Sequence, residues 1–142
     1  MSIPTVTFAD PEVLEVDYLK ARFLPRSESY KPATVTTAFP ATALTSTTHV
    51  QVELELGGAD DYPVTERAQV RFTCYAAPGK RTDVKALASL TMALIASQPG
   101  TSSIAGTSIL IGRSPVITDP DTKNLMVWFL ARVNLLATPL AP

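Results

Sequence analysis

The chain of 142 residues has one cysteine, one histidine and no long apolar run, and each shortage excludes a class of protein. A lone Cys74 can form neither an intrachain disulfide nor a thiolate zinc site. The first residues lack the basic and long apolar segments of a secretory signal, so we expect a protein that works in a cytoplasm. The longest apolar stretch, residues 125–131, ends at Arg132 and is far shorter than the roughly 20 residues of a membrane span. We therefore expect no membrane partner.

An excess of charge of one sign is also absent. Twelve Lys and Arg stand against 13 Asp and Glu, which gives a formal net charge of −1. Nucleic-acid binding depends largely on a basic surface that neutralises phosphates, so this balance argues against a free-standing nucleic-acid binder. The chain is 46% hydrophobic and 18% charged, which is a globular composition. Its length fits a single domain over residues 1–142, with short arms at 1–9 and 137–142.

The sequence predicts two helices. One should cover residues 11–24, because Asp10 can cap it and proline is favoured at its first position. The other should follow a cap at Thr82 or Asp83 and reach about residue 97, since apolar residues recur there at helical spacing. The polar side of the first helix is expected to carry Glu15, Lys20 and Arg22.

Five strands are predicted, from alternating apolar and polar residues and from runs rich in valine and threonine bounded by turn residues. They should cover residues 33–39, 50–56, 67–76, 107–118 and 125–137, with a loop at 41–48. Helix, strand, hairpin, helix and hairpin then follow one another (α-β-β-β-α-β-β). An α+β domain satisfies this order, with five mainly antiparallel strands and both helices packed on one side.

The second and third predicted strands should form a hairpin with one apolar and one charged face. The inward residues are Val50, Val52, Leu54 and Leu56 on one strand and Ala68, Val70, Phe72, Cys74 and Ala76 on the other. The outer face is acidic on the first strand, with Glu53 and Glu55, and basic on the second, with Arg67 and Arg71. Opposed charges on neighbouring strands attract, so the charge pattern supports the same pairing.

The last predicted strand is apolar on both faces. Val127, Phe129 and Ala131 alternate with Met126, Trp128 and Leu130. A strand of this kind is usually central and covered on both sides. Two explanations stay open: the helices cover the surplus apolar surface, or another subunit does.

The motifs that could carry catalysis or ligand binding all lack a required part. Gly79-Lys80 lies where a phosphate loop would, but Cys74 replaces the first glycine and Arg81 the Ser or Thr that binds magnesium. His49 has no specified catalytic partner and is expected on a strand surface. We expect no catalytic, cofactor-binding or metal-binding residues.

The remaining candidates have simple structural explanations. Asp60-Asp61 and the pair Asp119 and Asp121 are typical of turns. Cys74 falls on the apolar face of its strand, so we expect an inert thiol in the core.

In this order of elements the chain resembles the tail terminator proteins of long-tailed, siphophage-like bacteriophages. The similarity covers about residues 10–136 and lies in the order of its features, none of which is a catalytic signature. These features are the opening helix with Pro11-Glu12-Val13-Leu14 and Tyr18-Leu19, the strand Val35-Thr36-Thr37 that leads to Pro40, the segment from Val50 to Gly57-Gly58, Val70-Arg71-Phe72 with Tyr75-Ala76, the helix with Asp83, Leu87 and Leu90, and the closing apolar strand. The chain departs from the family in the Thr-rich segment before His49 and in both arms.

The resemblance implies a structural virion protein without enzymatic activity. Its copies would close into a ring, six in this family, that caps the tail tube, stops tube polymerisation and joins the tail to the head connector. The expected partners are further copies, the major tail tube protein and the head-tail connector or stopper protein. Genomic DNA would pass through the lumen without specific binding. The protein would stand at the head-proximal end of the tail in the virion, and in the host cytoplasm during assembly.

Six charged residues are candidates for contacts in such a ring. We expect Glu53, Glu55, Asp60 and Asp61 to face the lumen or the tube, and Lys80 and Arg81 to meet acidic groups of a neighbouring copy. Two alternatives remain. The chain could be another head-tail connector or completion protein, or, in a different class, a small ligand-binding domain or enzyme.

Overall fold

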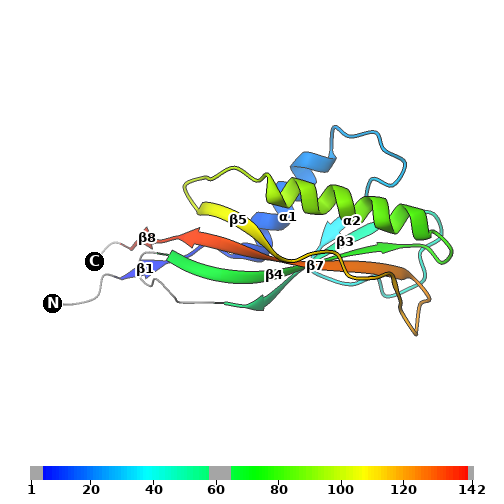
Figure 1. The fold of residues 1–142 in the computed structure, drawn as a ribbon. Helices are drawn as coiled ribbons and strands as arrows, with labels where there is room; N and C mark the ends of the chain where they lie inside the picture. The colour runs from blue at the N-terminus through cyan, green and yellow to red at the C-terminus, as the bar shows by residue number, and fades with distance from the viewer. Residues whose placement is uncertain (1–4, 58–64, 141–142) are drawn as a thin grey trace.

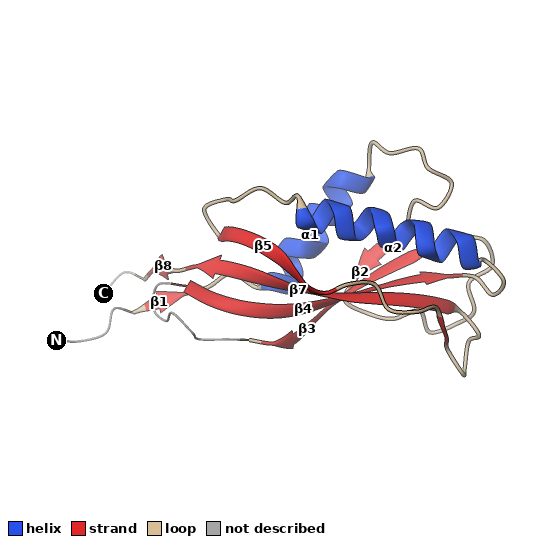
Figure 2. Cartoon of the chain, in the orientation of Figure 1, coloured by secondary structure: helices blue, strands red, loops and turns tan. Residues whose placement is uncertain are grey.

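A computed structural model describes residues 5–57 and 65–140 of the chain. Two helices lie on the same side of a twisted sheet (Figures 1 and 2). The elements in chain order are β1 (Val6–Thr7), α1 (Pro11–Phe23), β2 (Thr34–Thr36), β3 (His49–Leu56), β4 (Thr65–Ala76), α2 (Arg81–Ala96), β5 (Ile104–Ile111), β6 (Ile117–Thr118), β7 (Leu125–Leu136) and β8 (Thr138–Pro139). The predicted α+β class is confirmed, with eight strands in the described residues instead of five.

The main sheet has the strand order β2-β3-β4-β7-β5, and β6 pairs with β7 beyond the end of β5. The pairs are antiparallel except that between β2 and β3, which is parallel. β4 and β7 pair over twelve residues each, from Thr65 opposite Leu136 to Ala76 opposite Leu125. The closing strand is therefore central, as its apolar residues on both faces predict.

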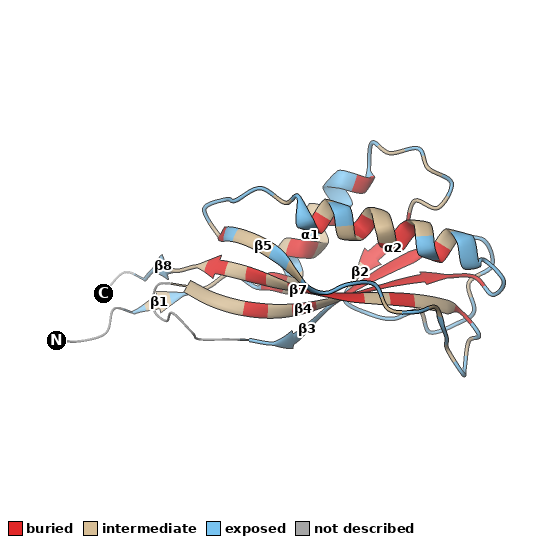
Figure 3. Ribbon diagram, viewed as in Figure 1, coloured by how far each residue is buried: buried red, intermediate tan, exposed pale blue. Residues whose placement is uncertain are grey.

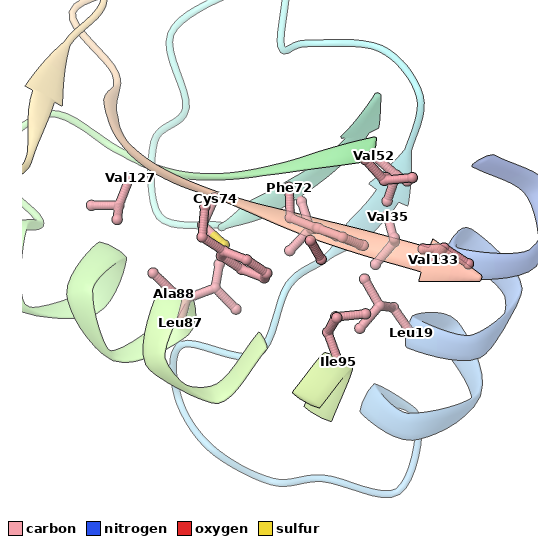
Figure 4. Packing of buried hydrophobic residues seen from close by; sticks show 14 of the residues in the cluster. Leu19, Val35, Val52, Phe72, Cys74, Leu87, Ala88, Ile95, Val127 and Val133 are labelled. Carbon is pink, nitrogen blue, oxygen red and sulfur yellow. The ribbon is translucent and has the colours of Figure 1, made fainter. Parts of the chain in front are cut away.

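The core lies between the sheet and the two helices. Every second residue of β4 from Ala68 to Ala76 is fully buried there, which confirms the predicted inward face. Figure 4 shows Phe72 and Cys74 of β4 among side chains from both helices. Phe72 stacks on Phe129 of β7, with 5.0 Å between the ring centroids. The helices contribute Leu19, Phe23, Val84, Leu87, Ala88 and Ile95 to this cluster.

Both helices begin close to their predicted positions. The carboxylate of Asp10 accepts a hydrogen bond from the backbone N–H of Glu12 (2.9 Å), so the predicted cap of α1 is confirmed. The predicted cap of α2 is wrong. The helix begins at Arg81, ahead of Thr82 and Asp83, and Lys80 occupies the cap position without a capping hydrogen bond from its side chain. Glycine at position 79 supplies the positive φ of 81° that the preceding turn requires.

The strand predicted over residues 107–118 is wrong as one element. β5 starts earlier, at Ile104, and ends at Ile111, and the short β6 follows after a connection at residues 112–116. The first predicted strand, 33–39, is also shorter and covers only Thr34–Thr36. Proline at 115 and glycine at 112 interrupt strand pairing, which explains the break before β6.

The face of the sheet away from the helices is partly covered by residues 37–48. Near this segment Gln51, Thr73 and Tyr75 are all buried, although they point away from the helices (Figure 3 shows the burial along each strand). The side chain of Asn124 fixes the segment, because it accepts from Leu44 N–H (2.8 Å) and donates to the carbonyl of Thr42 (3.1 Å). The predicted loop therefore serves as a cover for one end of the sheet.

The two predicted arms contact each other in the described residues. β1 and β8 form a separate antiparallel pair, with Val6 opposite Pro139 and Thr7 opposite Thr138. The backbone N–H of Leu140 also donates to the carbonyl of Thr5 (3.0 Å). Segments from both ends of the sequence are thus joined at one end of the molecule (Figure 1).

Candidate functional site

Beyond residues 37–48 the helix-free face of the sheet carries a charged and aromatic cluster. Arg71 of β4 forms an ion pair with Glu55 of β3, with 2.6 Å between Nε and Oε1. Its guanidinium carbon also lies 4.5 Å from the ring centroid of Trp128 on β7. The opposed charges predicted for the outer face of the hairpin are therefore present, and Glu53 lies directly opposite Arg71 in the register.

This face is not the acidic surface that Glu53 and Glu55 alone suggest. Both glutamates are exposed on β3, but Arg71 and Arg132 share the face with them. Arg71 neutralises part of the negative charge through its ion pair with Glu55. Asp60 and Asp61, the other predicted acidic contacts, lie outside the described residues.

The end of β3 projects beyond its neighbour on the outer side. β2 pairs only with His49, Val50 and Gln51, so among the described strands none pairs with the outer edge of residues 52–56. One backbone group on this outer edge has a hydrogen-bond partner, because Leu54 N–H donates to the carboxylate of Glu12 (2.8 Å). Leu54 keeps its predicted inward face, opposite the buried Val70, although it is 39% exposed. The predicted inward position of Leu56 is wrong, because the register shifts after Leu54 and places Leu56 opposite Gln69, with 59% of the residue exposed.

A groove on the opposite side of the molecule is lined by three cations. It lies between α2 and the connection from β5 to β6, and Arg81, Lys85 and Arg113 line it together with Met92, Gly112, Ser114, Pro115, Val116 and Val127. A guanidinium nitrogen of Arg113 contacts the hydroxyl of Ser89 on α2. Within the described ranges none of the three cations forms an ion pair.

The sequence predicts only one of the three cations that line this groove. Arg81 is one of the predicted contacts, while Lys80, at the cap position, is exposed but does not line the groove. Lys85 was not predicted, although its spacing of four residues from Arg81 places it on the same face of the helix. Arg113 lies in an irregular connection, and no sequence pattern places it beside α2.

His49 is not on the surface, contrary to the prediction. It is 7% exposed, beneath residues 37–48, and its Nε2 lies 2.7 Å from the carbonyl of Ala38. A carbonyl can only accept, so Nε2 carries the hydrogen, and Nδ1 accepts from the hydroxyl of Thr34. Burial lowers the pKa of His49, which the Ala38 carbonyl partly opposes. The ring therefore links β3, β2 and the covering segment.

Glu15 is buried as well, although it was predicted on the polar side of α1. It is fully buried, on the same helix stripe as Leu19 and Phe23, and neither carboxylate oxygen has a hydrogen-bond partner in the described part of the chain. Burial raises the pKa of Glu15 to about 7, while the side chain of Gln98 acts in the opposite direction. The sequence does contain an indication of this burial, because Glu15 lies four residues before Leu19 and so shares its helix face.

Cys74 and the acidic turn show no arrangement that indicates catalysis. The thiol is fully buried, and burial raises its pKa to about 12. Asp119 accepts from the backbone N–H of Asp121 (2.9 Å), as expected in a turn. Among the residues that the structure describes, no three His, Cys, Asp or Glu side chains are grouped to hold a metal ion. The helices in those same residues are also too short or too polar to cross a membrane.

The chain matches no protein-family model, and a search of the curated proteins finds no match.

Proposed function

We propose that this chain is a structural protein of the head-proximal end of a long phage tail. Its copies close into a ring of about six, as in the tail terminators that it resembles, on the last ring of the tail tube. The capped end no longer presents the surface that the next tube subunits recognise, so polymerisation stops. The exposed side of the ring then binds the head connector. This role depends on shape and needs no catalysis.

One observation supports this proposal most directly: the helices cover a single face of the sheet, and the segment 37–48 covers only part of the other. The uncovered part carries Trp128, and the exposed Leu56 and Ile111 lie on the same face at 59% and 49% exposure. Arginine and aromatic side chains with nearby apolar groups are enriched where proteins bind one another. The surface therefore suits contacts within an assembly.

The net charge is consistent with a passage for DNA. Six copies of a chain of formal charge −1 do not form a strongly basic channel, and Arg71 is already paired with Glu55. A channel that is not lined by rows of unpaired arginines does not bind DNA phosphates tightly. Genomic DNA would thus pass through the ring without specific binding.

The decisive experiment removes the gene from a phage that carries it. Electron microscopy of the lysate should show overlong tails without heads, and the wild-type gene supplied in trans should restore tails of normal length. The chain should also be present in purified virions, at the head-proximal end of the tail. Unattached tails of normal length would instead identify a connector protein, and normal virions would exclude both roles.

A further inference from the structure

The three cations of the groove beside α2 are placed unfavourably for the isolated chain. Arg81 lies in the first turn of a helix, where the helix dipole favours acids, and Lys80 at the cap position adds a second cation. Lys85 follows Arg81 on the same helix face, and like charges at this spacing repel each other. Arg113 approaches the same groove from the connection after β5. A local arrangement that costs stability is typical of a binding site.

The lining of the groove indicates the chemistry of its occupant. The groove encloses about 590 Å³ and combines the three cations with the apolar side chains of Met92, Val116 and Val127. Such a site favours a segment in which carboxylates alternate with apolar side chains. It is less suited to a bare phosphate, which has no apolar part to bury.

The chain itself presents such a segment on its opposite edge. Glu53, Leu54, Glu55 and Leu56 alternate along the projecting end of β3, and all four are exposed. Glu55 is held by Arg71, whereas Glu53 makes no ion pair in the described part of the chain. The backbone edge of this segment is also free of strand partners among the described strands.

The segment and the groove cannot meet within one copy. β3 lies toward the β2 edge of the sheet, while the groove lies beyond β7, at the β5 and β6 edge. A contact between two different patches of identical chains repeats head to tail, and it closes into a ring when the rotation is suitable. The two surfaces thus have the placement that a ring contact requires.

We infer that the projecting end of β3 from one copy, residues 53–56, docks into the groove of Arg81, Lys85 and Arg113 on the next copy. The inference rests on the proposed function, because it names the contact by which copies in the ring bind each other. Glu53 meets the cations, and Leu56, which the register shift places on the same face as Glu53, covers the apolar part of the groove.

The test uses two variants, each with one of the two surfaces disabled. The edge variant is Glu53→Lys, and the groove variant is Arg81→Glu with Lys85→Glu. In their mixture the native edge of the groove variant can meet the native groove of the edge variant, and the two reversed surfaces also match each other, so the mixture should associate although neither variant does so alone. Analytical ultracentrifugation and NMR titration at low ionic strength and millimolar protein should show at least about tenfold tighter binding in the mixture than in either variant alone.

A matched control and a rescue make the result specific. Lys20→Glu with Arg22→Glu changes two exposed cations on α1 and should not weaken association of the chain. A single chain with the edge and groove changes combined has both polarities reversed, so its association should recover. Circular dichroism and the fluorescence of Trp128 check that every variant is folded. A mixture no more associated than its components, at the highest concentration reached, would overturn the inference.

Further outcomes separate this contact from other possibilities. Inorganic phosphate or a short DNA duplex that binds the wild-type groove, with no complex in the mixture, would also overturn it. The complex together with normal tails after gene removal would leave the contact standing and exclude the tail role. Overlong tails without any complex would support the tail role and exclude this contact.

Discussion

The guanidinium of Arg71 lies over the indole of Trp128, with its central carbon 4.5 Å from the ring centroid. The two residues come from neighbouring strands, and Arg71 also forms an ion pair with Glu55. Arg71 therefore connects β3, β4 and β7 on the helix-free face.

Replacing Arg71 by alanine should lower the free energy of unfolding by about 1 kcal/mol, because an exposed cation–π contact contributes about 0.5–1 kcal/mol and an exposed ion pair a similar amount at most. The measurement is urea denaturation followed by the fluorescence of Trp128, the single tryptophan. The native emission should also change, since the guanidinium no longer covers the ring. Arg132→Ala, on the same face, is the control and should leave the emission unchanged.

Glu15 should make the protein less stable as the pH rises. Its pKa in the folded chain is about 7, above the ordinary value of 4.5, so the folded state binds the proton more tightly. The contribution of Glu15 to the free energy of unfolding is fully present below pH 4.5 and is lost as the pH rises through 7. One pKa unit corresponds to about 1.4 kcal/mol, so we expect a loss of about 3 kcal/mol between pH 5 and pH 8.

The variant Glu15→Gln tests this expectation. Its amide can donate to the side-chain oxygen of Gln98, which has no hydrogen-bond partner in the described residues. It should be more stable than the wild type at about pH 8 and should lose most of the pH dependence in urea denaturation. Asp17→Asn removes an exposed carboxylate from the same helix and should change stability by less than about 0.5 kcal/mol. Equal pH dependence in wild type and Glu15→Gln would contradict the assignment.

Local patterns predicted the elements whose side chains alternate without interruption. The inward residues of β4 follow from strict alternation, the central place of β7 follows from apolar residues on both of its faces, and the start of α1 follows from Asp10 and Pro11. These features depend on neighbours in the sequence, so the chain alone contains the information.

What the sequence did not predict depends on contacts between distant residues. The segment 37–48 buries His49, and the register shift near Leu56 moves this side chain to the other face of the sheet. Glu15 looks polar on a helical wheel, yet packing against the sheet and the end of α2 buries it. The groove likewise needs Arg113, which only the fold brings to α2.

Cys74 should be unreactive in the native protein. The thiol is fully buried and its pKa is about 12, so little thiolate forms and reagents have no access. Reaction with a disulfide reagent at about pH 8 should be at least roughly a hundredfold slower than in urea, because the thiol must be exposed by opening of the structure. Rapid stoichiometric labelling of the folded chain would contradict this prediction.

His49 should act on stability in the direction opposite to Glu15. Its pKa in the folded chain is below the ordinary 6.5, so the unfolded chain binds the proton more tightly. This contribution is fully present above pH 6.5 and is lost as the pH falls through the folded value. Protonation also changes Nδ1 from an acceptor to a donor, so the hydroxyl of Thr34 must reorient.

The two effects overlap in pH, so His49 is best studied in the Glu15→Gln background. There the free energy of unfolding should fall as the pH decreases below about 6.5, and His49→Gln should remove this fall. The same change should cost about 1–2 kcal/mol near pH 7.5, because Gln cannot satisfy both Thr34 and the Ala38 carbonyl. Hydrogen exchange should show that residues 37–48 open more readily in His49→Gln, because the link from Nε2 to Ala38 is weakened. An unchanged pH slope together with unchanged exchange would show that the ring does not hold this segment on the sheet.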